Sequence, residues 1–90
     1  GSYEKFVTFN GKRYSHIIDP RTGYPATGIV SVSVFAKTTE LADALATGIF
    51  VLGIEVGLDL VNQIKGIECI IVDEKGVVHS SKNIDLKKYE

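Results

Sequence analysis

The sequence has little that would stabilise it covalently or anchor it in a membrane. Cys69 is the only cysteine among the 90 residues, so no disulfide can form within the chain, and no cysteine–histidine cluster has the spacing of a zinc site. No apolar run reaches the roughly 18 residues that a membrane-spanning helix needs, and no stretch has the pattern of a signal peptide. These absences leave one small domain that depends on its own apolar core.

An excess of charge of either sign is also absent. Ten lysines and arginines stand against eleven aspartates and glutamates, which leaves a formal net charge of -1. No basic field is available to concentrate a polyanion, so we do not expect binding to nucleic acid. The hydrophobic fraction of 44% excludes a disordered segment. Cys69 falls in an apolar, strand-like run and is interpreted as a small core residue.

Local patterns predict an antiparallel sheet that is interrupted by a pair of helices. Asn10-Gly11 and the turn 73–76 each separate two strand-like runs and indicate hairpins. Thr38 or Thr39 can cap a helix that runs to about Val51. A second helix is expected over about 55–64, and the segment 17–28 is expected to be an ordered loop. The strands are expected at Tyr3–Phe9, Lys12–His16, Ile29–Phe35, Ile67–Asp73 and Val77–Ser80. The predicted fold class is α+β, an antiparallel sheet of about four or five strands with two helices on one face.

The segment from His16 to Pro25 concentrates polar and titratable side chains. It reads His-Ile-Ile-Asp-Pro-Arg-Thr-Gly-Tyr-Pro. Pro20 disfavours helical backbone dihedral angles at the preceding residue, Asp19. Arg21 can bind a phosphate or a carboxylate through two parallel hydrogen bonds. Asp-Pro and Thr-Gly are also common in ordinary turns, so the residues alone leave a purely structural loop as the alternative.

The predicted first helix carries a second group of polar side chains. Asp43 and Thr47 are four residues apart and therefore share one helix face. A carboxylate and a hydroxyl are hard oxygen ligands that suit magnesium or calcium. The alternative is local hydrogen bonding, in which Asp43 accepts from a nearby backbone amide and Thr47 bonds within its own helix.

Both segments resemble the signatures of the FAD:protein FMN transferases, historically called thiamine-biosynthesis lipoproteins. That family carries a histidine, two apolar residues, Asp-Pro-Arg-Thr-Gly, an aromatic residue and a proline, as residues 16–25 do here. Its second signature is a helix with Ala-Asp-Ala-x-Ala-Thr, followed by an apolar run and Leu-Gly, which matches residues 42–53. The preceding residues 11–14 fit as well.

The resemblance implies a magnesium-dependent transfer of FMN from FAD to a threonine of a target flavoprotein, with release of AMP. It implies that Asp43 and Thr47 are the metal ligands. His16 is the candidate base for the attacking hydroxyl, because the ordinary histidine pKa lies near working pH. Asp19 and Arg21 are the other candidate catalytic residues: Asp19 is expected to orient the loop, and Arg21 to contact phosphate or brace the loop. His16, Arg21 and Thr22 are the residues expected to bind FAD.

The resemblance covers almost the whole chain but only part of a typical family member. Residues 1–90 are therefore expected to be a single C-terminal fragment of a flavin transferase domain. Its expected partners are FAD, the acceptor flavoprotein, the missing N-terminal portion and a second copy in a homodimer. The isolated chain is expected to be inactive. Family members are typically exported, periplasmic or lipoprotein-anchored. Two alternatives stay open: a module that binds or hydrolyses FAD, and a non-catalytic folding or interaction fragment.

Overall fold

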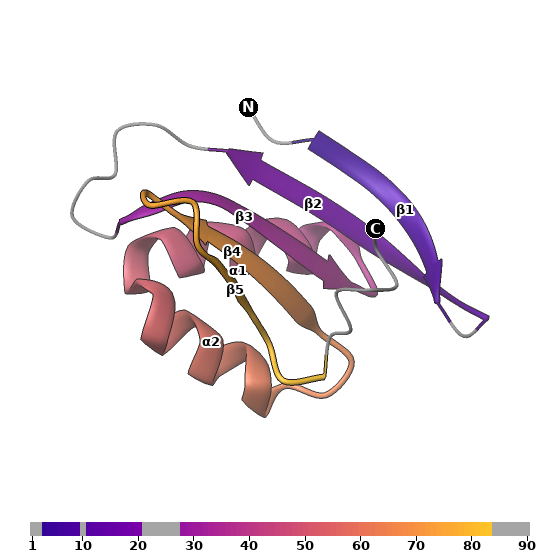
Figure 1. Cartoon of the computed structure of the whole chain (residues 1–90). Coiled ribbons are helices and arrows are strands. Elements are labelled where there is room, and N and C mark those ends of the chain that lie inside the picture. The colour runs from indigo at the N-terminus through magenta and orange to yellow at the C-terminus, as the bar shows by residue number, and fades with distance from the viewer. Residues whose placement is uncertain (1–2, 10, 21–27, 84–90) are drawn as a thin grey trace.

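The computed structural model describes residues 3–9, 11–20 and 28–83. Within these ranges the elements are β1 (Tyr3–Phe9), β2 (Lys12–Pro20), β3 (Ile29–Ala36), α1 (Thr39–Leu52), α2 (Ile54–Gln63), β4 (Glu68–Asp73) and β5 (Val78–Ser80). The strands form one five-stranded antiparallel sheet in the order β1-β2-β3-β4-β5. Both helices lie between β3 and β4 in the chain and cover one face of the sheet (Figure 1). The predicted α+β fold is confirmed.

The two predicted hairpins are present. β1 and β2 pair along the whole of β1, and Gly11 in their turn has a φ of 77°, a conformation that favours glycine. In the turn between β4 and β5, the Asp73 carboxylate accepts hydrogen bonds from the backbone N–H groups of Lys75 and Val77, each at 2.9 Å. The backbone N–H of Gly76 donates to the Asp73 carbonyl at 3.0 Å. Short-range hydrogen bonds therefore define this second turn.

The predicted loop over residues 17–28 is wrong for its first four residues. β2 continues to Pro20 and pairs with β3 as far as Ser31. The side chains of Ile17 and Asp19 are buried, so the strand extends because β3 and the helices cover it. Among the described residues, Pro20 pairs only with Ser31 of β3, a strand-end position at which proline is tolerated. Residues 21–27 lie outside the described part of the chain.

Helix α1 begins with a side-chain cap. The Thr38 hydroxyl accepts a hydrogen bond from the backbone N–H of Leu41 at 3.2 Å, so Thr38 is the cap of the two candidate threonines. The Thr39 hydroxyl instead donates to the Glu4 carboxylate at 2.8 Å and lies 3.3 Å from the hydroxyl oxygen of Ser15. The start of α1 is thereby connected to β1 and β2.

The core lies between the sheet and the two helices. Alternate side chains of the inner strands point toward the helices. The core includes Ile17, Val32, Val34, Cys69 and Ile71 from the sheet, and Leu45, Ile49, Phe50 and Val61 from the helices. Burial, followed by the nearby Glu68 carboxylate, raises the pKa of the Cys69 thiol to about 12. Cys69 is therefore a protonated core residue, as the sequence predicts.

Candidate functional site

Asp43 and Thr47 lie together on the outer face of α1. The buried residues of this helix face the sheet and are Ala42, Leu45, Ala46, Ile49 and Phe50. Asp43 and Thr47 fall between them in sequence but are exposed. Their spacing of one helical turn places the two Cβ atoms about 5–6 Å apart. Asp43 and Thr47 therefore share one face of α1, as predicted, and this face points away from the core.

The chemistry of these two side chains fits a hard cation only as part of a larger site. Among the described residues, no group of three or more His, Cys, Asp or Glu side chains gathers to hold a metal. Magnesium typically takes one or two carboxylates and completes its octahedral shell with phosphate oxygens and water. A carboxylate and a hydroxyl on an exposed helix face match that partial contribution.

His16 lies on the other face of the sheet. Its partner across β3 is Phe35, and the two rings are stacked with their centroids 4.1 Å apart and their planes 10° apart. The imidazole Nε2 is buried and has no hydrogen-bond partner among the described residues. Burial, followed by the positive charge of Lys5, lowers the pKa of His16 from its ordinary value of 6.5. The imidazole is therefore neutral at neutral pH, which is the form that accepts a proton.

Asp19 is buried on the face of the sheet that the helices cover. Its side chain is 2% exposed, and it lies opposite Val32 of β3. Because side chains alternate along a strand, Asp19 and His16, which are three residues apart, point to opposite faces of β2. A buried carboxylate at the end of β2 is suited to holding the segment that follows, rather than to contacting a dissolved ligand.

The structure therefore brings some of the predicted site residues together and separates others. Asp43 and Thr47 share a face of α1, whereas His16 lies on the side of the sheet away from the helices. Arg21 and Thr22 lie outside the described residues.

A matching family model covers residues 1–71 and describes the ApbE family. This chain belongs to the ApbE family. Among curated relatives, an FAD:protein FMN transferase of Treponema pallidum is 45% identical over 85 residues, which are 93% of this chain and 24% of the relative. The protein of that name from Rhodobacter capsulatus is 51% identical over 55 residues, 61% of this chain and 10% of the relative. The Escherichia coli protein of that name is 42% identical over 77 residues, which are 84% of this chain and 22% of the relative.

The resemblance noted from the two signatures is thereby confirmed as membership of the family. The chain spans 24% of the Treponema pallidum relative and 22% of the Escherichia coli relative. The family similarity includes residues 16–25 and 42–53, so both signatures lie inside the matched region. In this part of the chain, no described helix is long and apolar enough to cross a membrane.

Sequence reasoning assigned no function to a set of basic residues that the structure gathers in one place. Lys12 from the start of β2 lines the same hollow as Tyr14, together with Lys37 and Lys65 from two connections between elements. The three lysines do not form one local motif, because they are far apart in sequence. The net charge of the chain does not reveal these lysines either, because positive and negative residues are nearly equal in number.

Proposed function

We propose that this chain is the C-terminal portion of an FAD:protein FMN transferase and that it supplies the magnesium-binding side of the active site. The observation that carries the proposal is the pair of exposed oxygen ligands, Asp43 and Thr47, on one face of α1 in a chain of the ApbE family. The relatives are named for transferring FMN from FAD to protein. In the proposed reaction FAD is the donor and a threonine of a flavoprotein is the acceptor.

The reaction is a transfer at phosphorus. The acceptor hydroxyl attacks the phosphorus nearest the flavin, a new P–O bond forms, and the bond to the AMP phosphate breaks as AMP leaves. Such transfers depend on positioning and on neutralising phosphate charge more than on covalent catalysis. A bound magnesium ion would supply that neutralisation. The Asp43 carboxylate and the Thr47 hydroxyl would hold it from one side while FAD phosphates and water complete its shell.

His16 is proposed as the group that takes the proton of the acceptor hydroxyl. Its lowered pKa keeps the imidazole neutral, and its buried Nε2 has no hydrogen-bond partner among the described residues. A buried polar atom of this kind favours a partner from outside the described part of the chain. A base must come within hydrogen-bond distance of the proton it takes. His16 and the Asp43–Thr47 pair lie on opposite sides of the sheet, so this role requires the rest of the enzyme to bring the acceptor hydroxyl to the His16 face.

The segment after β2 is proposed to contact FAD. Arg21 can bind phosphate through its guanidinium group, and the Thr22 hydroxyl can donate to a phosphate oxygen. Asp19 would act through this segment, because its buried side chain lies at the strand end from which the segment leaves.

The outer face of α1 is suited to being covered by further protein. Val51 follows Thr47 by one helical turn and is 67% exposed, so an apolar side chain continues the row that starts at Asp43. In a longer protein this face can pack against another segment that contributes the remaining ligands. We therefore expect neither tight magnesium binding nor FMN transfer by this chain alone.

Mass spectrometry of an acceptor peptide, incubated with FAD and magnesium, tests the proposal. We expect no peptide modification with this chain alone, and addition of one FMN when the N-terminal portion of the enzyme is added. Asp43→Asn should abolish the restored transfer while the circular-dichroism spectrum is unchanged. Asp59→Asn, which changes another exposed helical aspartate, is the matched control and should retain transfer.

Other results would contradict parts of the proposal. Restored transfer that survives Asp43→Asn would exclude Asp43 as a required metal ligand. AMP release without modification of the peptide would indicate FAD hydrolysis instead of transfer. For His16→Ala we expect a larger loss in kcat than in FAD affinity, since a base acts mainly in the transition state. Equal activity of wild type and His16→Ala would exclude the proposed base.

A further inference from the structure

A hollow of about 720 Å³ lies at the end of the sheet where β2 and β4 begin. Six residues line it: Lys12, Arg13, Tyr14, Lys37, Lys65 and Gly66. They come from the start of β2, the connection from β3 to α1, and the connection from α2 to β4. None of them belongs to the residues proposed for FAD or for the metal. We call this site the basic hollow.

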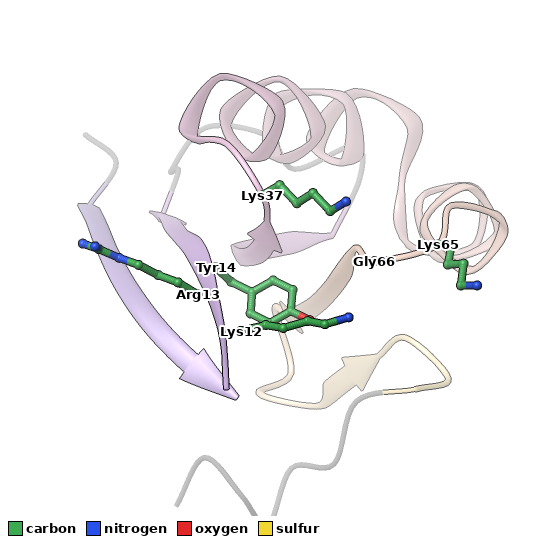
Figure 2. Close-up of a pocket in the computed structure, with 6 residues that line it drawn as sticks. All are labelled: Lys12, Arg13, Tyr14, Lys37, Lys65 and Gly66. Carbon is green, nitrogen blue, oxygen red and sulfur yellow. The ribbon is translucent and has the colours of Figure 1, made fainter. Parts of the chain in front are cut away.

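The three lysines of the basic hollow line it from three different places in the chain. Figure 2 shows Lys12 and Lys37 extending toward the side on which Lys65 and Gly66 lie, with the Tyr14 ring beside Lys12, whereas the Lys65 side chain ends on the side away from the other two lysines. Arg13 extends the other way, where its guanidinium carbon lies 4.2 Å from the centre of the Phe6 ring. Three lysines and one aromatic side chain therefore line the hollow.

The positive charge in the basic hollow is not neutralised by described residues. The lining residues include no carboxylate, and none of the three lysines forms an ion pair with a described residue. Glu68, which is three residues from Lys65 in sequence, accepts a hydrogen bond from the Ser81 hydroxyl at 2.6 Å. Three like charges around one space repel each other, and this repulsion is relieved when an anion enters.

The shape of the hollow favours a small ligand. Its volume lies within the roughly 300–1,000 Å³ typical of small-molecule sites. Gly66 contributes no side chain, and a Cβ built there would meet nothing within 4 Å, so the space beside the lysines is open. The φ of 85° at this glycine disfavours any larger residue.

We propose that the basic hollow binds a phosphate-bearing polyanion through Lys12, Lys37 and Lys65. Phosphate oxygens accept charge-assisted hydrogen bonds from ammonium groups, and several phosphates are needed to balance three lysines that are spread around one space. A soluble polyphosphate compound and a group of lipid phosphates share this chemistry. The site is independent of the proposed transferase activity, because it uses no residue of that site.

Calorimetric titration with inorganic tripolyphosphate at low salt, in the absence of magnesium, tests the site on the whole chain. We expect Lys37→Gln and Lys65→Gln each to weaken binding about tenfold, the usual scale for the loss of a charge-assisted hydrogen bond. Added salt should weaken wild-type binding through screening. Lys75→Gln is the matched control, because Lys75 lies in the β4–β5 turn at the other end of β4 and should leave binding unchanged.

Co-sedimentation with lipid vesicles distinguishes lipid phosphates from a soluble ligand. Vesicles of phosphatidylcholine with phosphatidylglycerol are compared with pure phosphatidylcholine vesicles. Co-sedimentation with the anionic vesicles that is lost in the Lys37→Gln, Lys65→Gln double variant assigns the site to lipid phosphates. Binding of tripolyphosphate without co-sedimentation assigns it to a soluble ligand.

Two results would overturn the proposal. The first is failure of both tripolyphosphate and anionic vesicles to bind. The second is an equal loss of binding in Lys75→Gln and Lys37→Gln, which would show a general charge effect and no site. Asp43→Asn should leave tripolyphosphate binding unchanged. This variant therefore separates failure of the basic hollow from failure of the transferase proposal.

Discussion

At the scale of single residues, His16 is the most informative side chain. Its ring packs face to face on Phe35, and its environment lowers the pKa because burial and the charge of Lys5 both disfavour the imidazolium ion. The unfolded chain has the ordinary pKa of 6.5. The two states therefore bind different numbers of protons in the pH range below 6.5.

This difference predicts how stability depends on pH. The stabilisation from neutral His16 is fully present above the unfolded pKa of 6.5, and it is lost as pH falls from 6.5 through the lower folded value. Urea unfolding at several pH values on either side of 6.5 measures the effect. His16→Gln should reduce the decline. An unchanged decline in His16→Gln would show that another group is responsible.

A second prediction at this scale compares two helical glycines. A Cβ at Gly57 of α2 would lie 3.1 Å from the Ile49 side chain, whereas a Cβ at Gly48 of α1 would meet nothing within 4 Å. Alanine improves helix propensity by about 1 kcal/mol, but overpacking a buried side chain costs about 1–3 kcal/mol. Because Ile49 is completely buried, we expect Gly57→Ala to destabilise the protein by about 1 kcal/mol.

Gly48→Ala should instead raise the free energy of unfolding by about 0.5–1 kcal/mol, since it gains the propensity without a clash. Denaturant unfolding of both variants measures the difference. Equal stabilisation by the two substitutions would show that α2 can move away from α1 at no cost.

At the scale of the elements, the start of α1 depends on a single capping side chain. The hydrogen bond from the Leu41 N–H to the Thr38 hydroxyl satisfies a backbone group that the helix cannot pair internally. Thr38→Ala should lower the free energy of unfolding by about 1 kcal/mol, whereas Thr38→Ser keeps an acceptor and should restore most of it. Thermal unfolding followed by circular dichroism checks both. Equal stability of the alanine and serine variants would exclude a role for the hydroxyl.

Element types followed from the sequence where the stabilising bonds are local. The Thr38 cap and the Asp73 turn each involve residues two to four positions apart, so their patterns are visible in a short window. The length of β2 was not visible, because its continuation to Pro20 depends on pairing with β3 and on cover from the helices. Turn-forming residues around Pro20 indicated a loop, and tertiary burial outweighed that local preference.

At the scale of the whole molecule, an apolar patch stands at the junction of the helices. It consists of Val51, Leu52 and Val56, which are 67%, 47% and 53% exposed. Exposed apolar side chains that lie close together mark a surface that another protein segment covers. In a chain that spans about a quarter of its Treponema pallidum relative, that segment can belong to the same enzyme or to a second copy of this chain.

We expect the isolated chain to form a homodimer at high concentration, through this patch or through strand exchange. Val51→Lys combined with Val56→Lys should shift the molecule toward the monomer, because a dimer through this patch would bury two unpaired charges from each copy. Val77→Lys, at a valine that is 50% exposed in the β4–β5 connection, is the control and should leave the dimer intact. Light scattering measures the mass. A purely monomeric wild type at millimolar concentration would contradict the prediction.

The sequence by itself determined the family and the identity of the local elements. Contiguous motifs carry both kinds of information: residues 16–25 and 42–53 match the family signatures, and alternation, caps and turns are set by near neighbours. The sequence also placed Asp43 and Thr47 on one face, because the helical period alone fixes that relation.

Only the tertiary structure decided which groups meet across long distances in the chain. Pairing with β3 extends β2 to Pro20, so that His16 and Asp19 lie in one strand and point to opposite faces. The arrangement of strands and helices also gathers Lys12, Lys37 and Lys65 around one hollow. The physical reason is that electrostatic energies and burial depend on separation in space. A chain with a net charge of -1 can therefore still contain a strongly basic site.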